Sequence, residues 1–213
     1  MSSGDVTGVG SSSIAAVWSN TQVCSGPADL VASGERALHA TSLFIVLASA
    51  GLITALVTHD FSLAYVASYT SANLPLVYTI TAFWGGQGGT FLLWALLTAT
   101  LGLVLVRQRH PLAGAAVPFV NLPLVILELA CLVRGPFATF APGSAPVDGQ
   151  GLNPLLQDVW MTIHPPVLFL GYAAMTVPFA LALAAVARRD RDGWVRPALP
   201  WVALAAATLA AGI

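Results

Sequence analysis

The chain has 213 residues, of which 57% are hydrophobic and 8% are charged, and its mean hydropathy is +0.81. Soluble domains carry about 25% charged residues, so this composition excludes an ordinary soluble domain and indicates an integral membrane protein. Eight arginines, no lysine and a net charge of −1 give no sign of a nucleic-acid partner. Cys24 and Cys131 form no C-x-x-C motif, and Cys131 is expected to be a small core residue.

Apolar stretches predict the membrane spans. Residues 1–37 are rich in Ser and Gly and remain poorly defined, with neither a convincing span nor a basic signal-peptide start. Residues 38–213 are expected to form one all-α domain, a polytopic helical bundle in the lipid bilayer, because a spanning helix needs about 20 mostly apolar residues. About five spans are predicted, near residues 38–58, 83–106, 112–132, 166–187 and 197–213, the second starting near Thr81.

The arginines predict the orientation. Seven of the eight fall in alternate connections, which the positive-inside rule assigns to the cytoplasm: Arg36, Arg107, Arg109, Arg188, Arg189, Arg191 and Arg196. The segments 60–82 and 133–165 are then expected on the outer side, together with His59 and His164.

The first outer segment is aromatic and ends in a glycine cluster. Tyr65, Tyr69, Tyr78, Phe83 and Trp84 fit either an aromatic belt at the headgroups or a shaped binding surface. The run WGGQGG, residues 84–89, allows close helix packing or unusual backbone dihedrals, and packing alone is sufficient to explain it.

The second outer segment predicts a short interfacial helix over residues 153–163. Asn153 is a suitable N-cap with Pro154 at the first helical position. One face is apolar, and Gln157, Asp158 and Thr162 lie on the other. The prolines 165 and 166 are expected to end this helix and begin the next. The apolar face consists of Leu155, Leu156, Val159, Trp160 and Ile163.

Two polar residues are candidates for function. His164, placed at the helix corner, is either a capping residue or a ligand of a metal or haem iron, or else a proton-transfer group. Glu128, within the third span, is either a functional buried acid or an acid tolerated near the interface, since a charge at the bilayer centre costs about 2.5–3.5 kcal/mol.

Two long motifs carry a family resemblance. The stretches HDFSLAYVASYTSANLPLVYTITAFWGGQGGTFLLW (residues 59–94) and LNPLLQDVWMTIHPPVLFLGY (residues 152–172) resemble the N-terminal part of the CcmF/CycK/NrfE family of cytochrome c-type biogenesis proteins. This resemblance implies a haem lyase component of the inner (cytoplasmic) membrane with its functional face toward the periplasm. Haem delivered by the chaperone CcmE would be attached to the C-x-x-C-H thiols of apocytochrome c, with CcmH-type apocytochrome-handling proteins as further partners.

The resemblance also implies site residues. The histidine of the family's HPP motif is an axial ligand of haem iron, which corresponds to His164 here. Trp160, Ile163, Pro165 and Trp84 are expected to surround the haem. No catalytic residue is assigned.

The sequence also departs from the family pattern. Gly88-Gly89-Thr90 stands where relatives have an acid followed by Gly-Ser, and His59 stands where they commonly have Asn, so it is not promoted to a second ligand. The chain is expected to stop before the family's Trp-rich WWD loop and later histidines, as a fragment or split-gene piece that is inactive alone. A transporter or channel subunit, favoured by Glu128 and a proline-broken third span, and a structural subunit without cofactor remain the alternatives.

Overall fold

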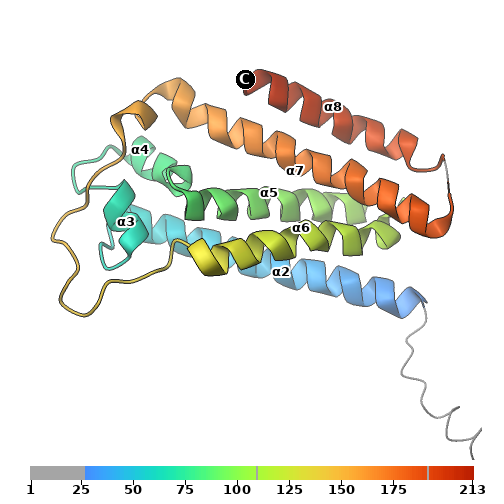
Figure 1. The fold of residues 1–213 in the computed structure, drawn as a ribbon, viewed down its shortest axis with the longest axis horizontal. Coiled ribbons are helices and arrows are strands. Elements are labelled where there is room, and N and C mark those ends of the chain that lie inside the picture. Colours follow the sequence, from blue (N-terminus) through green and yellow to red (C-terminus); the bar gives the residue numbers. More distant parts are fainter. Residues whose placement is uncertain (1–26, 109, 191) are drawn as a thin grey trace, which may run out of the picture.

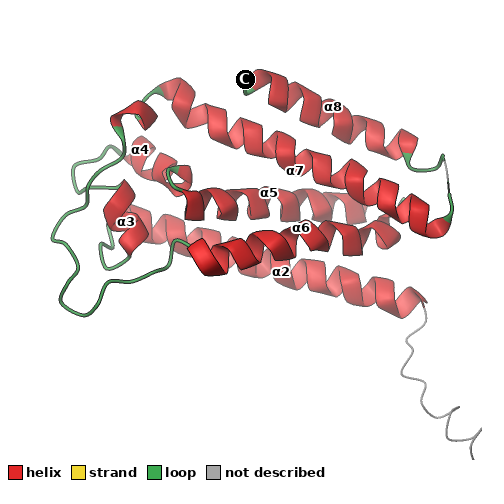
Figure 2. Ribbon diagram, in the orientation of Figure 1, coloured by secondary structure: helices red, strands yellow, loops and turns green. Residues whose placement is uncertain are grey.

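The computed structural model describes residues 27–108, 110–190 and 192–213, and this part of the chain is helical with no β-strand (Figures 1 and 2). The expected all-α bundle is confirmed. The long helices are α2 (Pro27–Val57), α5 (Gln87–Arg107), α6 (Ala113–Arg134), α7 (Val159–Arg188) and α8 (Val195–Ala211). The short elements are α3 (Ala64–Tyr69), α4 (Leu76–Thr81) and the 3-10 turns η1 (Ala82–Trp84) and η2 (Pro154–Leu156).

The centre of the bundle is α5, which packs against α2, α6 and α7, while α8 packs mainly against the outer side of α7 (Figure 1). Small residues allow this close packing in a membrane, where helices gain little from hydrophobic burial against each other. Gly102 of α5 faces Val120 of α6 and Leu38 of α2, and Gly171 of α7 faces Leu209 of α8. The core therefore runs along α5 and the inner faces of its three neighbours.

Four of the helices in the described residues, α2, α5, α6 and α7, are long and apolar enough to cross a membrane. The fifth predicted span corresponds to α8, a shorter apolar helix of 17 residues. Two helices begin at other residues than the sequence suggested. The first helix begins at Pro27 instead of Leu38, and α5 begins at Gln87, because α4 and η1 occupy the residues around Thr81.

The segment 153–163 does not form the single interfacial helix that was predicted from its apolar face. Asn153 caps only the three-residue turn η2, and α7 then starts at Val159 and runs through both Pro165 and Pro166. A proline removes one backbone donor, and membrane helices tolerate this loss where neighbouring groups satisfy the freed carbonyls. Prolines also lie inside α6 and α8. His164 is therefore the sixth residue of a spanning helix and not a corner between two helices.

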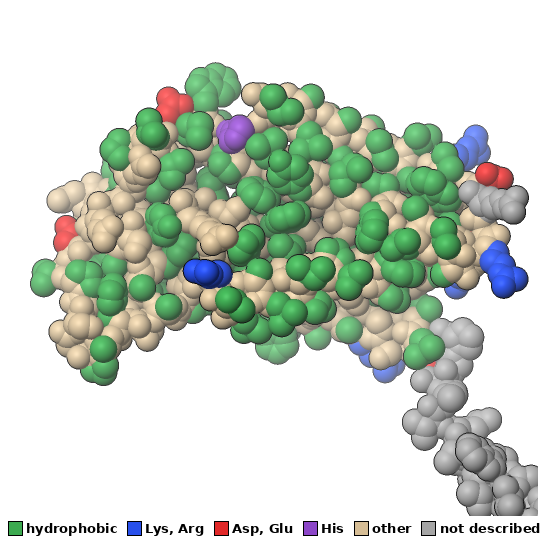
Figure 3. Space-filling view, in the orientation of Figure 1, with side chains coloured by type: hydrophobic (Ala, Val, Ile, Leu, Met, Phe, Trp, Pro, Cys, Tyr) green, Lys and Arg blue, Asp and Glu red, His purple; other side chains and the backbone are tan. Residues whose placement is uncertain are grey.

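The two ends of the bundle differ in charge and in structure. The segments 58–86 and 135–158 lie at one end, called the loop end, and the α5–α6 and α7–α8 connections lie at the other, called the arginine end (Figure 1). Basic side chains gather at the arginine end, and hydrophobic side chains cover the middle of the face seen in Figure 3. Arg134 lies at the loop end of α6, whereas Arg109 and Arg191, like residues 1–26 with Cys24, are outside the described residues.

His59 closes α2 in a left-handed backbone conformation, with φ of 54°. The His59 amide donates to the Leu56 carbonyl at 3.2 Å, and the Asp60 amide donates to the Ala55 carbonyl at 3.0 Å, which is the Schellman pattern of helix termination. Gly and Asn adopt this conformation at the lowest cost. The backbone conformation therefore gives a structural reason for the Asn that the family pattern has where this chain has His59, independent of any ligand.

Candidate functional site

The two segments at the loop end are joined by backbone hydrogen bonds into one layer. Leu63 and Thr139 form an isolated antiparallel bridge, and the Phe140 amide donates to the Ser62 carbonyl at 3.0 Å. Further along, the Gln150 amide donates to the Ala67 carbonyl at 2.7 Å. Because both segments satisfy each other's backbone groups, they form a fixed platform over the ends of the spans.

The glycine cluster serves this platform by close packing. A Cβ on Gly89 would overlap the Phe83 carbonyl oxygen and the Tyr65 hydroxyl, and one on Gly88 would lie 2.6 Å from the Arg134 carbonyl oxygen. The Tyr65 hydroxyl donates to the turn just before this cluster, with the Ala82 carbonyl at 3.0 Å and the Phe83 carbonyl at 3.1 Å. Burial raises the pKa of Tyr65 above its usual range, and the backbone at Gly86 opposes this only in part. The packing interpretation of WGGQGG accounts for the positions of these glycines.

The aromatic residues of the first outer segment are mostly inside the platform. Tyr65 and Phe83 are buried, and Tyr69, Tyr78 and Trp84 are half-buried against the core. The rings of Tyr65 and Tyr69 lie 4.6 Å apart. The indole nitrogen of Trp84 is buried and has no hydrogen-bond partner among the residues that the structure describes. These residues therefore build the platform and leave little open aromatic surface between its segments.

The start of α7 is held to the platform by side-chain caps. The Asp158 carboxylate accepts from the Trp160 amide at 2.9 Å and from the Met161 amide at 3.4 Å. Just before it, the Gln157 side chain donates to the Leu152 carbonyl at 2.8 Å, and Leu152 is buried, with its side chain against Gly85. The first turn of α7 thus has a defined position relative to the glycine cluster.

His164 lies on an open apolar face of α7. Trp160, Ile163, His164 and Val167 follow the spacing of one helical face, and they line a shallow pocket of about 220 Å³. Trp160 is 78% exposed and Ile163 is 50% exposed. The opposite wall is the end of α8, with Ala211, Gly212 and Ile213. The pocket is smaller than the roughly 300–1,000 Å³ of ligand sites that enclose their ligand, so a large ligand would be covered on one side only.

The imidazole of His164 forms no hydrogen bond with a described residue, which distinguishes it from two other histidines. Nδ1 of His39 is 2.7 Å from the Glu35 carbonyl oxygen, and Nδ1 of His110 accepts from the Leu112 amide at 3.2 Å. The described residues contain no cluster of three or more His, Cys, Asp or Glu side chains for a metal ion. A single free imidazole beside exposed Trp and Ile side chains fits an axial ligand of a planar, apolar iron cofactor better than a multi-ligand metal site.

The site residues predicted from the sequence are brought together only in part. Trp160, Ile163 and His164 share the pocket, whereas Pro165 and Trp84 are not among the residues that line it. The wall from α8 was not predicted, since it depends on the contacts of Gly171 with Leu209 and of Gly212 with Leu168. A sequence pattern within one helix carries no signal for such a pairing.

Glu128 occupies a different region. It lies within α6, six residues before Arg134, which is about 9 Å from the end of the helix. Pro118 and Pro123 do not interrupt α6. This span is therefore a continuous helix, and the expected break at its prolines, which favoured a transporter, was wrong.

Comparisons with known proteins identify the family. The profile of the family described as "Cytochrome C assembly protein" matches residues 30–198. The chain is 36% identical over 176 residues to the cytochrome c-type biogenesis protein CcmF of Pseudomonas fluorescens, covering 80% of this chain and 26% of the relative. It is 36% identical over 199 residues to CcmF of Escherichia coli, covering 90% of this chain and 30% of that relative. It is 35% identical over 199 residues to CycK of Rhizobium meliloti, covering 88% of this chain and 28% of that relative.

No solved structure matches the chain. The chain spans less than a third of the length of these curated relatives. The predicted resemblance is nevertheless confirmed over most of this chain, and the four long apolar helices agree with a multi-pass membrane protein. The chain belongs to the cytochrome c assembly family, within the group of the CcmF, CycK and NrfE cytochrome c-type biogenesis proteins.

Proposed function

We propose that this chain supplies one side of a haem-binding site in a cytochrome c haem lyase, with His164 as an axial ligand of the haem iron. The observation that carries the proposal is the free imidazole of His164 beside exposed Trp160 and Ile163 at the loop end of the bundle. Membership of the family of cytochrome c-type biogenesis proteins supports it.

In this proposal the residues of the chain bind the haem and set its orientation. The Asp158 cap fixes the first turn of α7, so the direction of the imidazole is set by a rigid helix. Trp160 and Ile163 offer apolar contact area to one face or edge of the porphyrin. When bound, the haem supplies the vinyl groups to which the two thiols of apocytochrome c add to form thioethers.

The proposal places this work on the periplasmic side of the inner membrane. The arginine end would face the cytoplasm under the positive-inside rule, and the loop end would face outward. CcmE as haem donor, apocytochrome c as acceptor and CcmH-type proteins as apocytochrome handlers are the proposed partners. Because the pocket covers a ligand on one side only, the remaining ligand and cover would come from outside the described residues.

The test is cytochrome c maturation in cells that depend on this protein, expressed together with the other maturation proteins. His164→Ala is expected to abolish covalent cytochrome c, measured by haem staining, while the protein remains in the membrane at normal levels. His110→Ala, a histidine at the arginine end, is the matched control and should mature cytochrome c normally. Normal maturation with His164→Ala would refute the proposed ligand role.

A further inference from the structure

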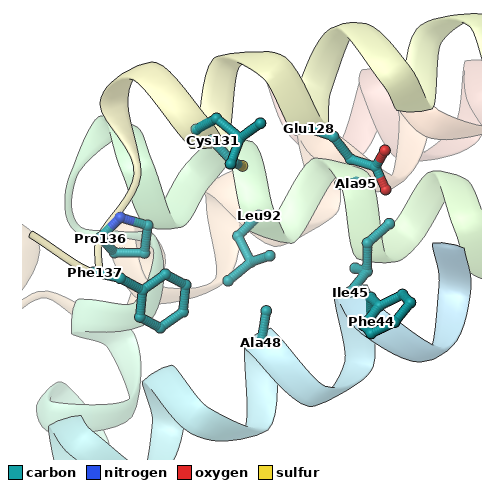
Figure 4. A pocket seen from close by; sticks show the side chains of 10 residues that line it. Phe44, Ile45, Ala48, Leu92, Ala95, Glu128, Cys131, Pro136 and Phe137 are labelled. Carbon is teal, nitrogen blue, oxygen red and sulfur yellow. The ribbon is translucent and has the colours of Figure 1, made fainter.

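A groove of about 340 Å³ lies between α2 and α6, with α5 as its floor (Figure 4). One wall comes from α2 and the other from α6, and the loop after α6 closes the end nearest the platform. Apart from one carboxylate the lining is almost entirely apolar. The lining residues are Phe44, Ile45, Ala48, Leu92, Ala95, Glu128, Cys131, Leu132, Pro136 and Phe137.

The groove is open toward the side of the bundle. Phe44 of α2 is 69% exposed and Leu132 of α6 is 81% exposed, so the rims of the groove face the surroundings of the bundle and not its core. Ala48 and Ala95 are small, and their short side chains leave the space between the rims free. A membrane-embedded occupant therefore has lateral access to the groove.

Glu128 is the single charged residue of the groove, and its carboxylate points toward Ile45 on the α2 side (Figure 4). No described residue forms a hydrogen bond or an ion pair with this carboxylate. Its position about 9 Å inside the end of α6 puts it within the apolar layer, where an acid without a partner costs free energy. The groove thus combines an apolar surface with a carboxylate that needs a hydrogen-bond donor.

We propose that this groove binds a membrane-spanning helix of a partner polypeptide, which presents a basic side chain to Glu128. The apolar lining accommodates the apolar side chains of such a helix, and the small residues allow its backbone to come close. An arginine or lysine on the partner satisfies the carboxylate where water is scarce. The partner is defined by this pairing of an apolar helix face with one cation.

The position of the carboxylate along the groove favours a helix over a lipid. Pro136 and Phe137 lie at the loop end, and Glu128 with Phe44 and Ile45 lies toward the membrane centre (Figure 4). A lipid whose head is at the loop-end interface would direct its apolar tail at the carboxylate. A helix instead carries side chains at every depth, so it can place a cation opposite Glu128.

The described arginines of a second copy of this chain do not supply that cation. Among the arginines of the described helices, Arg134 lies at the loop end of α6, and Arg107, Arg188 and Arg196 lie at the arginine end. Arg36 lies inside α2, 21 residues before Val57 at the loop end, which is about 32 Å along the helix. None is at the depth of Glu128 in a copy with the same membrane orientation. The occupant is accordingly a different helix.

The test uses the full chain in liposomes, with an acceptor dye on a C-terminal tag. The probes are donor-labelled synthetic Leu-Ala helices of about 21 residues, a length that spans the bilayer. One carries a single arginine about 9 Å below the loop-end interface, and the other carries leucine there. Energy transfer is expected to show about tenfold tighter association of the arginine helix, in line with interhelical polar contacts of about 1–2 kcal/mol.

Glu128→Gln should remove this preference to within about twofold, while Glu35→Gln, a carboxylate of α2 that does not line the groove, should retain it. Circular dichroism and thermal unfolding establish that each variant is folded. If Glu128→Gln does not fold, Ala48→Phe serves instead, because it fills the groove while the carboxylate remains; it should weaken binding of the arginine helix.

Three results would overturn the proposal. The wild-type chain could bind both helices equally, or the folded groove variant could bind the arginine helix as the wild type does. Alternatively, an unlabelled copy of the chain could displace the arginine helix as effectively as the unlabelled arginine helix itself, which would make the groove an interface for self-association.

Discussion

The Tyr65 hydroxyl accepts a hydrogen bond from the Gly86 amide at 3.1 Å, across 21 positions of the chain. The same hydroxyl is the donor to the carbonyls of Ala82 and Phe83. One side chain from α3 therefore satisfies backbone groups in the turn that leads into α5. This contact links the platform to the central helix of the bundle.

Tyr65→Phe is expected to destabilise the protein by about 1–3 kcal/mol, because backbone groups at Ala82, Phe83 and Gly86 lose a buried partner. Thermal unfolding in detergent measures the effect. Tyr78→Phe, which removes a hydroxyl from a half-buried ring of α4, is the control with little expected change. Equal stability of both variants would show that the Tyr65 hydroxyl contributes nothing to the platform.

Gly89→Ala is expected to destabilise strongly, by more than about 3 kcal/mol, because the new Cβ would overlap the backbone carbonyl of Phe83 and the Tyr65 hydroxyl. Gly51→Ala in α2 meets nothing within 4 Å, and should be neutral or stabilising by up to about 1 kcal/mol from helix propensity. Thermal midpoints of the two variants in the same detergent test the contrast. Similar midpoints would contradict the packing role of the cluster.

His59→Asn and His59→Gly are expected to stabilise the protein by up to about 1–2 kcal/mol, because both residues adopt the left-handed conformation more readily. The Nε2 atom of His59 is buried and has no hydrogen-bond partner in the described part of the chain, so its removal adds to the gain. His59→Val should destabilise. A loss of stability in the glycine variant would mean that the imidazole makes a contribution that outweighs the backbone cost.

The sequence predicted the class of the fold, most of the spans and the uneven placement of arginine, because apolar runs of span length and clustered charges are local properties. The start of α7 was predicted wrongly, because prolines that would end a helix in a soluble protein were expected to end one here. Instead, α7 contains Pro165, Pro166 and Pro178. The pocket beside His164 needs a wall from α8, and the groove beside Glu128 needs three helices. Those features arise from tertiary packing and leave no periodic signal in the chain.

The orientation of the bundle is a separate prediction. In intact cells a membrane-impermeant thiol reagent should label Val147→Cys, whose parent side chain is 100% exposed in the loop-end segment, and should not label Asp192→Cys at the arginine end. Both variants should be labelled after the membrane is opened. Labelling of position 192 but not 147 in intact cells would reverse the proposed topology.

The proposed role of His164 is tested most directly by the visible spectrum of the assembled protein and by its response to imidazole. The account predicts that His164→Gly loses the haem absorbance and that added imidazole restores part of it, because the small ligand occupies the vacated iron coordination site. Cytochrome c levels should follow the same pattern. An unchanged haem spectrum in His164→Gly, with no response to imidazole, would contradict the account and leave His164 as a structural residue of α7.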